Sequence, residues 1–222
     1  MLTSAISNVN YPEIDIIFKA FPASLRHDVE MVIEVLPFDL NVLFRFNKVI
    51  KVDCLIHSDL QKIYLDRETL EIPSRIYFNE PKAEKEEELT DLQKNILNCL
   101  YLRHHNGIVR QKRLERLLDK NDYFIIPYKF HLLGEYVIEI LDDLQKHITT
   151  NSVDSFAKFA VDNEKYFVKT ESRMANYWNA YYRWKSQKLR NYIGRQNIDQ
   201  IKKGTHNIRF AARLAGRWNK QQ

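Results

Sequence analysis

The stretch that decides the fold is Thr90–Leu118, TDLQKNILNCLYLRHHNGIVRQKRLERLL, whose pattern is typical of two helices joined by a turn. Thr90 and Gln93 have the spacing of a capping box, in which each side chain accepts a hydrogen bond from the backbone N–H of the other residue. Apolar residues then recur on one helical face, at Leu92, Ile96, Cys99 and Leu100. The pattern predicts a helix that begins after Thr90.

The first helix is predicted to end at Asn106-Gly107, because glycine tolerates the left-handed conformation that closes helices. His104 and His105 would then lie in the last turn, where the helix dipole favours positive charge. We interpret this histidine pair as a helix end. A metal or catalytic site is disfavoured because the sequence holds no HExxH, CxxC or His-x-x-x-His pattern.

The second helix of the pair is predicted to start near Ile108. Its periodicity divides the side chains between two faces. The residues predicted to point inward are Leu114, Leu117 and Leu118, and those predicted to point mostly outward are Arg110, Lys112, Arg113 and Arg116.

Pro127, at a first-turn position, predicts a long helix that continues to Ile148. Its apolar stripe would comprise Leu133, Tyr136, Val137, Ile140, Leu141, Leu144 and Ile148. Four polar residues, His131, Glu135, Glu139 and Asp143, recur at the four-residue spacing from which carboxylate-bridged metal sites are built. The Glu-x-x-His pair that a di-iron site needs is absent, so we interpret the row as the solvent side of the helix and predict no metal or other cofactor.

A short β-region is predicted between about Val49 and Phe78. Apolar Ile50, Val52, Cys54 and Ile56 recur at every second position, and the segments KIYLD and RIYF have the β-branched and aromatic content of strands. Pro73 cannot donate to a ladder, so its strand must lie at an edge or end there. We predict two to four short strands.

The low counts of five glycines and six prolines in 222 residues favour long helices with few tight turns. We therefore predict an α+β fold that is predominantly helical, in which a short N-terminal β-region precedes an antiparallel helical bundle with a basic C-terminal helix. The predicted divisions are an N-terminal region at 1–80, a charged linker at 81–89, and the bundle with its basic tail helix at 90–222. Within the first region, Pro37 should stop the helical pattern of Leu25–Leu36.

Several protein classes are disfavoured by the sequence. No apolar run is long enough to span a membrane, and the first residues lack the pattern of a secretion signal. Cys54 and Cys99 are predicted to be reduced, half-buried thiols of a cytoplasmic protein. Because no Gly-rich phosphate loop or Gly-x-Ser-x-Gly elbow occurs, no catalytic residue is predicted, although an enzyme with a site assembled by the fold stays open.

The C-terminal forty residues, Arg183–Gln222, hold eleven Lys or Arg residues and one acid, Asp199. This segment carries a net charge of +10, against −5 for the rest of the chain. Such asymmetry is expected of a surface that meets phosphate or another acidic partner. Aromatic residues are interleaved with this charge and also precede it, in NYWNAYYRW at Asn176–Trp184.

Our first hypothesis is a non-catalytic nucleic-acid-binding protein that takes RNA or another single strand, because aromatic rings stack on unpaired bases while arginines hold the backbone. The predicted phosphate contacts are Arg183, Lys185, Arg190, Arg195, Lys202, Lys203, Arg209, Arg213 and Arg217, and the predicted stacking residues are Trp184 and Trp218.

The alternative hypothesis is a protein-interaction or assembly module. A stripe of Ile208, Ala211, Ala212 and Ala215 beside arginines describes a basic amphipathic helix, which also suits an acidic protein groove, an anionic membrane surface or a second copy of the chain. The basic residues can also pair with acids of Glu80–Leu89 and of the long helix. Aromatics at helical spacing, as in Tyr177–Trp184, are more typical of a core, so exposure of Trp184 and Trp218 would favour base stacking and burial would favour docking.

Overall fold

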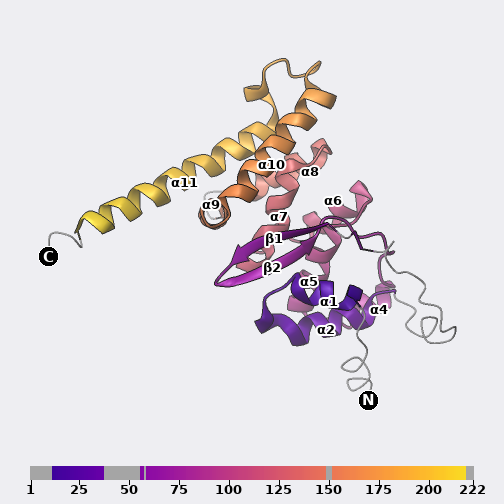
Figure 1. Cartoon of the computed structure of the whole chain (residues 1–222). Helices are drawn as coiled ribbons and strands as arrows, with labels where there is room; N and C mark the ends of the chain where they lie inside the picture. The colour runs from indigo at the N-terminus through magenta and orange to yellow at the C-terminus, as the bar shows by residue number, and fades with distance from the viewer. Residues whose placement is uncertain (1–11, 38–55, 58, 149–151, 219–222) are drawn as a thin grey trace. The chain divides into compact units, whose positions relative to one another are not determined.

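The computed structural model describes residues 12–37, 56–57, 59–148 and 152–218, with the side chains of 12–13 and 214–218 excepted (Figure 1). Most of these residues lie in helices, and the described residues also include a two-stranded antiparallel sheet. The predicted fold class is therefore confirmed. The chain divides into two compact units, Met1–Arg110 and Gln111–Gln222. Residues 81–89 contain a short helix, and their role as a linker stays a prediction.

The first unit is built from short helices around a β-hairpin. Its helices are α1 (Pro12–Lys19), a 3-10 turn (Ala23–Leu25), α2 (Arg26–Val35), α4 (Ala83–Glu87) and α5 (Asp91–Tyr101), followed by the start of α6 (Gly107–Glu115). The capping box is confirmed: the Gln93 N–H donates to Thr90 Oγ1 at 3.3 Å, and the Thr90 N–H donates to Gln93 Oε1 at 3.0 Å. Helix α2 ends just before Pro37, as predicted, and packs against α5.

The hairpin consists of β1 (Leu60–Leu65) and β2 (Glu68–Pro73), which pair from Leu65 opposite Glu68 to Leu60 opposite Pro73. The predicted β-region is therefore confirmed at Leu60–Pro73, and Pro73 ends its strand as expected. The segment RIYF is not a strand and contributes isolated bridges at Ile76. Alternate residues of both strands are buried, among them Ile63, Leu65, Leu70 and Ile72. The predicted strand positions Ile50, Val52 and Cys54 lie outside the described residues.

The hairpin turn is formed by Asp66 and Arg67, which have φ angles of 43° and 75°. Positive φ at both central residues matches the twist of the strands, but it strains any residue with a Cβ. We expect Arg67→Gly to stabilise the hairpin by about 0.5–1 kcal/mol. Glycine relieves the backbone strain, and part of this gain is offset because glycine loses more conformational entropy on folding. Slower amide hydrogen exchange in β1 and β2 would show it. Arg67→Ala is the control, and a gain as large as that of glycine would contradict the strain.

The turn after α5 differs from the prediction. Helix α5 ends at Tyr101, Gly107 is the first residue of α6, and no glycine of the described residues has a positive φ. The reason is an extended pairing, in which the Ile76 N–H donates to the Arg103 carbonyl and the His105 N–H donates to the Ile76 carbonyl, each at 3.0 Å. His104 and His105 therefore lie beside Ile76, in an isolated bridge, instead of in a helical turn.

Two arginines of α6 that were predicted to point outward are buried. Arg110 is 1% exposed, and its Nη1 donates to the carbonyls of His104 and His105 at 2.7 and 2.9 Å. It thus satisfies carbonyls of the turn after α5, which explains why it turns inward. Arg113 is also buried, whereas Leu118, predicted inward, is exposed. The other four assignments are confirmed: Leu114 and Leu117 are buried, and Lys112 and Arg116 are exposed.

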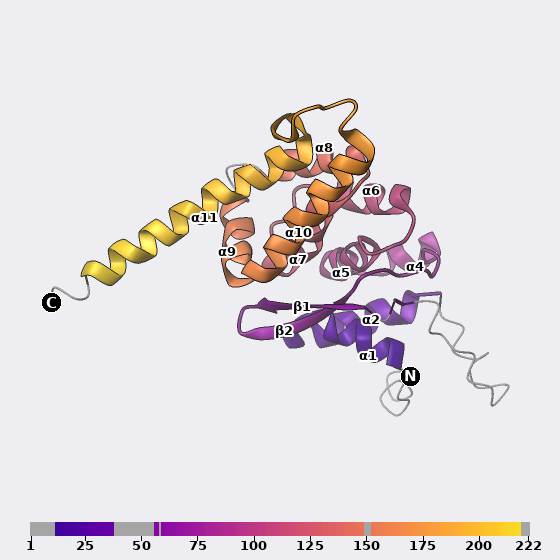
Figure 2. The same cartoon turned by 45° about the horizontal axis from the view of Figure 1, so that its top comes forward.

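The second unit contains a 3-10 turn (Tyr123–Ile125), α7 (Ile126–His131), a 3-10 turn (Leu132–Gly134), α8 (Ile138–His147), α9 (Val153–Asp162), α10 (Glu164–Tyr177), a π-helical segment (Trp178–Tyr182), a 3-10 turn (Leu189–Asn191) and α11 (Ile193–Trp218). Helices α8, α9 and α10 all pack against α11. Figures 1 and 2 show α10 and α11 running side by side in opposite directions, joined by the loop that includes Arg183–Asn191.

The single helix predicted from Pro127 to Ile148 is wrong, because the chain breaks between α7 and α8. Arg173 of α10 donates from Nη2 to the His131 carbonyl at 2.8 Å, and so occupies the acceptor that the Glu135 N–H would use in a continuing helix. A Cβ at Gly134 would lie 2.3 Å from Arg173 Nε, so glycine leaves room for this guanidinium. Glu135 is extended, and the helix restarts at Ile138.

The polar row on that segment is not its solvent side. His131, Glu135 and Asp143 are buried, and only Glu139 of the four is exposed. A ring nitrogen of His131 lies 2.6 Å from the hydroxyl oxygen of Tyr166, which is a hydrogen bond inside the unit. The break between α7 and α8 also removes the four-residue periodicity that would place these groups on one helix face.

Helix α11 is fixed at its N-terminal half and extends beyond its neighbours at its C-terminal half (Figures 1 and 2). A Cβ at Gly204 would lie 2.8 Å from the Ala157 Cβ of α9, and Asn197 Nδ2 donates to the Leu141 carbonyl at 2.9 Å. Residues 209–213 are all exposed. Within the described ranges, the helices are either too short or too polar to cross a bilayer.

Candidate nucleic-acid interface

The predicted basic residues fall into two groups in the second unit. Arg183, Lys185 and Arg190 lie on the loop between α10 and α11, and all three are exposed. The others, Arg195, Lys202, Lys203, Arg209, Arg213 and Arg217, lie on α11, as does Trp218. The side chains of Arg217 and Trp218 are outside the described part of the structure.

Three of the α11 cations make ion pairs within the unit. Arg195 contacts Glu171 and Asp199, each at 2.8 Å, and Lys202 contacts the same Glu171 oxygen at 2.6 Å. These acids raise the pKa of Arg195 above its ordinary value. Arg209 lies 3.1 Å from Glu164, in an exposed pair. The acids are on α10 and α11, whereas the sequence suggested partners in Glu80–Leu89 or on the long helix.

The loop keeps its positive charge unpaired. No ion pair involves Lys185, Lys188 or Arg190 among the residues that the structure describes, and all three are exposed. Lys188 was not among the predicted contacts. A signal that would have found it is the run from Ser172 to Ile198, which contains no acidic residue. The loop is therefore a local source of positive potential that the fold does not neutralise.

Two aromatic residues of the segment Tyr177–Trp184 lie on the surface and not in the core that their helical spacing favours, and the other three are half-buried. Trp184 is 80% exposed and Tyr181 is 54% exposed. The rings of Tyr136, Tyr177 and Tyr181 contact one another, with centroids 5.6 to 6.1 Å apart. The Trp184 Nε1–H donates to the Tyr181 carbonyl at 2.9 Å, which restricts the orientation of an otherwise open indole ring.

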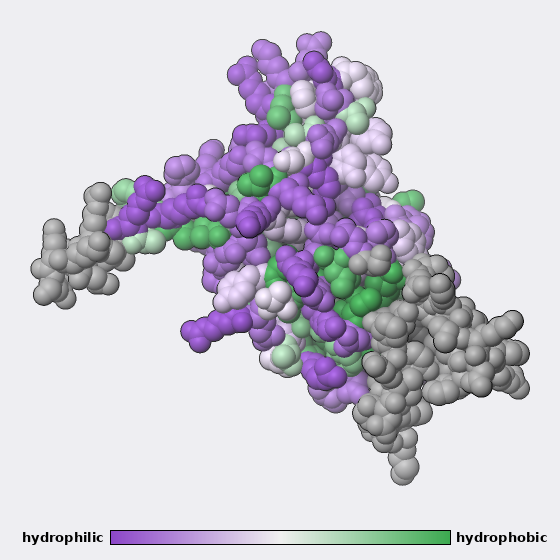
Figure 3. Space-filling view, viewed as in Figure 1, coloured by the Kyte–Doolittle hydropathy of each residue, from purple (hydrophilic) through white to green (hydrophobic). Residues whose placement is uncertain are grey.

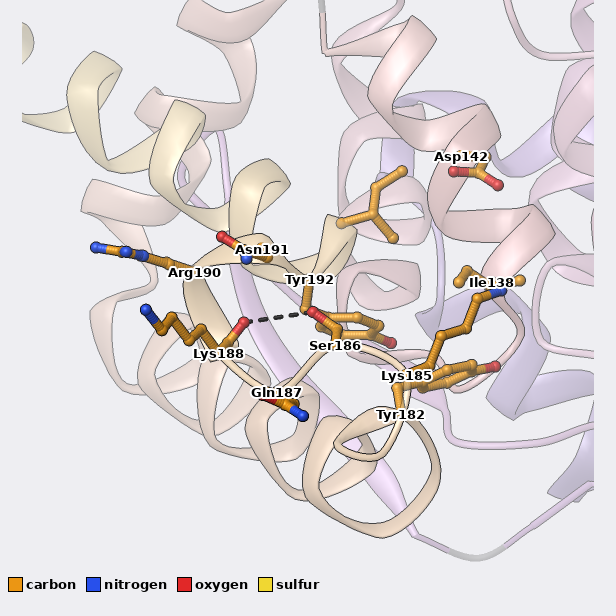
Figure 4. Close-up of a pocket in the computed structure, with 11 residues that line it drawn as sticks. Ile138, Asp142, Tyr182, Lys185, Ser186, Gln187, Lys188, Arg190, Asn191 and Tyr192 are labelled. Carbon is orange, nitrogen blue, oxygen red and sulfur yellow. Dashed lines mark hydrogen bonds between the residues drawn. The ribbon is translucent and has the colours of Figure 1, made fainter.

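Local hydrogen bonds give the loop its shape. The helix widens at the π-helical segment Trp178–Tyr182, a form that is rare and frequently found at functional sites. The Trp178 Nε1–H then donates to the Ser186 carbonyl at 2.8 Å, and the Ser186 hydroxyl donates to the Lys188 carbonyl at 3.3 Å (Figure 4). These bonds hold the exposed cations on an ordered backbone.

The histidine pair is explained by its surroundings. His104 is buried, and its Nδ1 accepts a hydrogen bond from the Asn106 N–H at 3.1 Å. Burial, together with the neighbouring His105, lowers the pKa of His104. In the described ranges, no three His, Cys, Asp or Glu residues come together as metal ligands would. The side chain of Cys99 is fully buried, more deeply than predicted, and Cys54 lies outside the described residues.

The chain matches no family model, and comparisons with curated proteins and with solved structures found no match. The loop and α11 together carry the predicted phosphate-contact and stacking residues.

Proposed function

We propose that this protein binds single-stranded nucleic acid, RNA in the first place, through the loop between α10 and α11. The observation that carries the proposal is the Trp184 ring, which is 80% exposed and oriented by a hydrogen bond, in a loop with unpaired cations. A planar ring that faces solvent accepts the face of an unpaired base, and adjacent Lys and Arg side chains neutralise phosphates. No catalytic residue is needed for this activity.

Figure 3 shows mostly hydrophilic residues on the visible face of α11, with some hydrophobic residues along one side of the helix. Lys203 and Arg213 are exposed on this helix, so they extend the positive surface beyond the loop. We place the protein in the cytoplasm as part of the same proposal, since a chain of this length with two cysteines suits a reducing compartment.

The sharpest test of the stacking role is Trp184→Ala. We expect affinity for a single-stranded oligonucleotide to fall by about 1–3 kcal/mol, or about 5- to 150-fold, measured by fluorescence polarisation. Stability should hardly change, because the ring is exposed. Trp184→Phe should restore part of the loss, and Tyr64→Ala, which removes an exposed aromatic of the hairpin, should leave affinity unchanged. Equal affinity of Trp184→Ala and the unaltered protein would contradict the stacking role.

A second candidate function is docking on an acidic protein surface, including that of a second copy of this chain. Phe210 is 64% exposed on the part of α11 that extends beyond its neighbours, between Arg209 and Arg213. A large exposed apolar side chain within a basic face is typical of an interface. Self-association of the nuclease-treated protein that disappears with Phe210→Glu, in analytical ultracentrifugation, would favour this function.

A further inference from the structure

An open hollow of about 600 Å³ lies at the loop, within the second unit (Figure 4). Part of its lining is apolar and aromatic, with Ile138, Ile193 and the rings of Tyr182 and Tyr192, which stack at 5.3 Å between centroids. Its volume is in the range of pockets that hold small organic ligands, about 300–1,000 Å³.

The remaining lining of the hollow is polar, with three cations and one acid, Asp142. It includes Lys185, Lys188 and Arg190. Figure 4 shows the charged ends of Lys188 and Arg190 directed to the same side, away from the ring of Tyr182. An aromatic part beside a cationic part matches a nucleotide, whose base is flat and whose phosphate is anionic.

The hydroxyl of Tyr192 makes no hydrogen bond within the described part of the second unit. The residue is 2% exposed, and its hydroxyl is buried with no hydrogen-bond partner among the described residues. Burial, and then the neighbouring Tyr182, raise its pKa, so the group is a neutral O–H donor at physiological pH. A buried donor without an acceptor is unfavourable, and a ligand that supplies an acceptor removes this cost.

We propose that the hollow binds one unpaired nucleotide of the strand, with its phosphate on Lys188 and Arg190 and its base against the Tyr182 and Tyr192 rings. Asp142 lines the same hollow and is an acceptor only. A carboxylate accepts from an exocyclic amine and repels a carbonyl at the same place, so the preferred base carries an amine, as cytosine does and uracil does not. The Tyr192 hydroxyl donates to an acceptor of that base.

This inference rests on the proposed function and adds a base preference to it. The test is isothermal titration of the nuclease-treated full chain with CMP and with UMP at about 50 mM salt. We expect CMP to bind about tenfold more tightly. Asp142→Asn should remove most of this preference, because an amide both donates and accepts. Inorganic phosphate should bind more weakly than CMP, since it lacks the base.

Tyr192→Phe separates binding from a structural role. The variant should bind CMP about five- to tenfold more weakly, yet it should be at least as stable to urea, because it removes a buried unpaired hydroxyl. Equal binding of CMP and UMP, or of CMP and phosphate, would overturn the inference. If oligonucleotides still bind in that case, the proposed function stands without the nucleotide pocket; if no oligonucleotide binds, the proposed function fails as well.

Discussion

Replacing Lys185, Lys188 and Arg190 together by glutamate is expected to lower the affinity for a single-stranded oligonucleotide by about 100-fold or more at low salt. These three cations make no ion pair among the described residues, so their charge is available to phosphates. Losing three phosphate contacts should also reduce the slope of log K against log salt by about 2, at roughly 0.7 per contact for single strands. Fluorescence polarisation at several salt concentrations measures both quantities.

The matched control for this variant is the glutamate triple at Lys82, Lys112 and Lys165. These lysines are exposed and lie elsewhere in the chain, and the change in net charge is the same. Only the variant with the altered loop should show the reduced slope of log K against log salt. An equal loss of affinity in both triples would mean that net charge alone attracts the ligand, and the loop would not be the interface.

The second large effect is a loss of stability in acid that depends on His147. Burial, with the nearby Lys129 ammonium, lowers the pKa of His147 to about 4. Its Nδ1 lies 3.4 Å from Lys129 Nζ, and its Nε2 is buried without a partner in the described residues. The unfolded chain takes up a proton near pH 6.5 and the folded chain only near pH 4, so stability falls as pH decreases through that window. The expected loss is on the order of 2–3 kcal/mol.

Urea denaturation followed by tryptophan fluorescence is a suitable measurement, because Trp178, Trp184 and Trp218 all belong to the second unit. In His147→Leu, the free energy of unfolding should change much less between pH 4 and 6.5 than in the unaltered protein. The control is His206→Gln, which alters an exposed histidine of the same unit and should leave the slope unchanged. A slope that persists in His147→Leu would assign the acid sensitivity to other groups.

Local sequence signals predicted the parts of the fold that local interactions determine. The capping box of Thr90 and Gln93, the helix end before Pro37 and the strand end at Pro73 each depend on a few neighbouring residues. The break between α7 and α8 was missed because it depends on Arg173, which is 42 positions from the His131 carbonyl that it binds. The inward turn of Arg110 likewise depends on carbonyls that become free only once the chain after α5 pairs with Ile76.

The candidate site was predictable to a similar extent. Charge composition predicted the basic C-terminal region, and the aromatic residues interleaved with that charge predicted Trp184, since both are properties of the sequence itself. Which cations are neutralised depends on the tertiary structure, because Glu171 lies on α10 and its partners Arg195 and Lys202 lie on α11. The buried hydroxyl of Tyr192 and the hollow beside it also arise only when the loop folds back over α8.

The proposed function requires the loop and the adjoining α11 to bind single strands through phosphates and bases. Its most direct test is binding of a labelled single-stranded RNA to the nuclease-treated protein by fluorescence polarisation, from about 50 to about 200 mM salt, beside a DNA duplex of matched length. Tighter binding of the single strand, with an affinity that falls steeply as salt increases, is the predicted result. Absence of binding at the lowest salt, or a preference for the duplex, would contradict the claim.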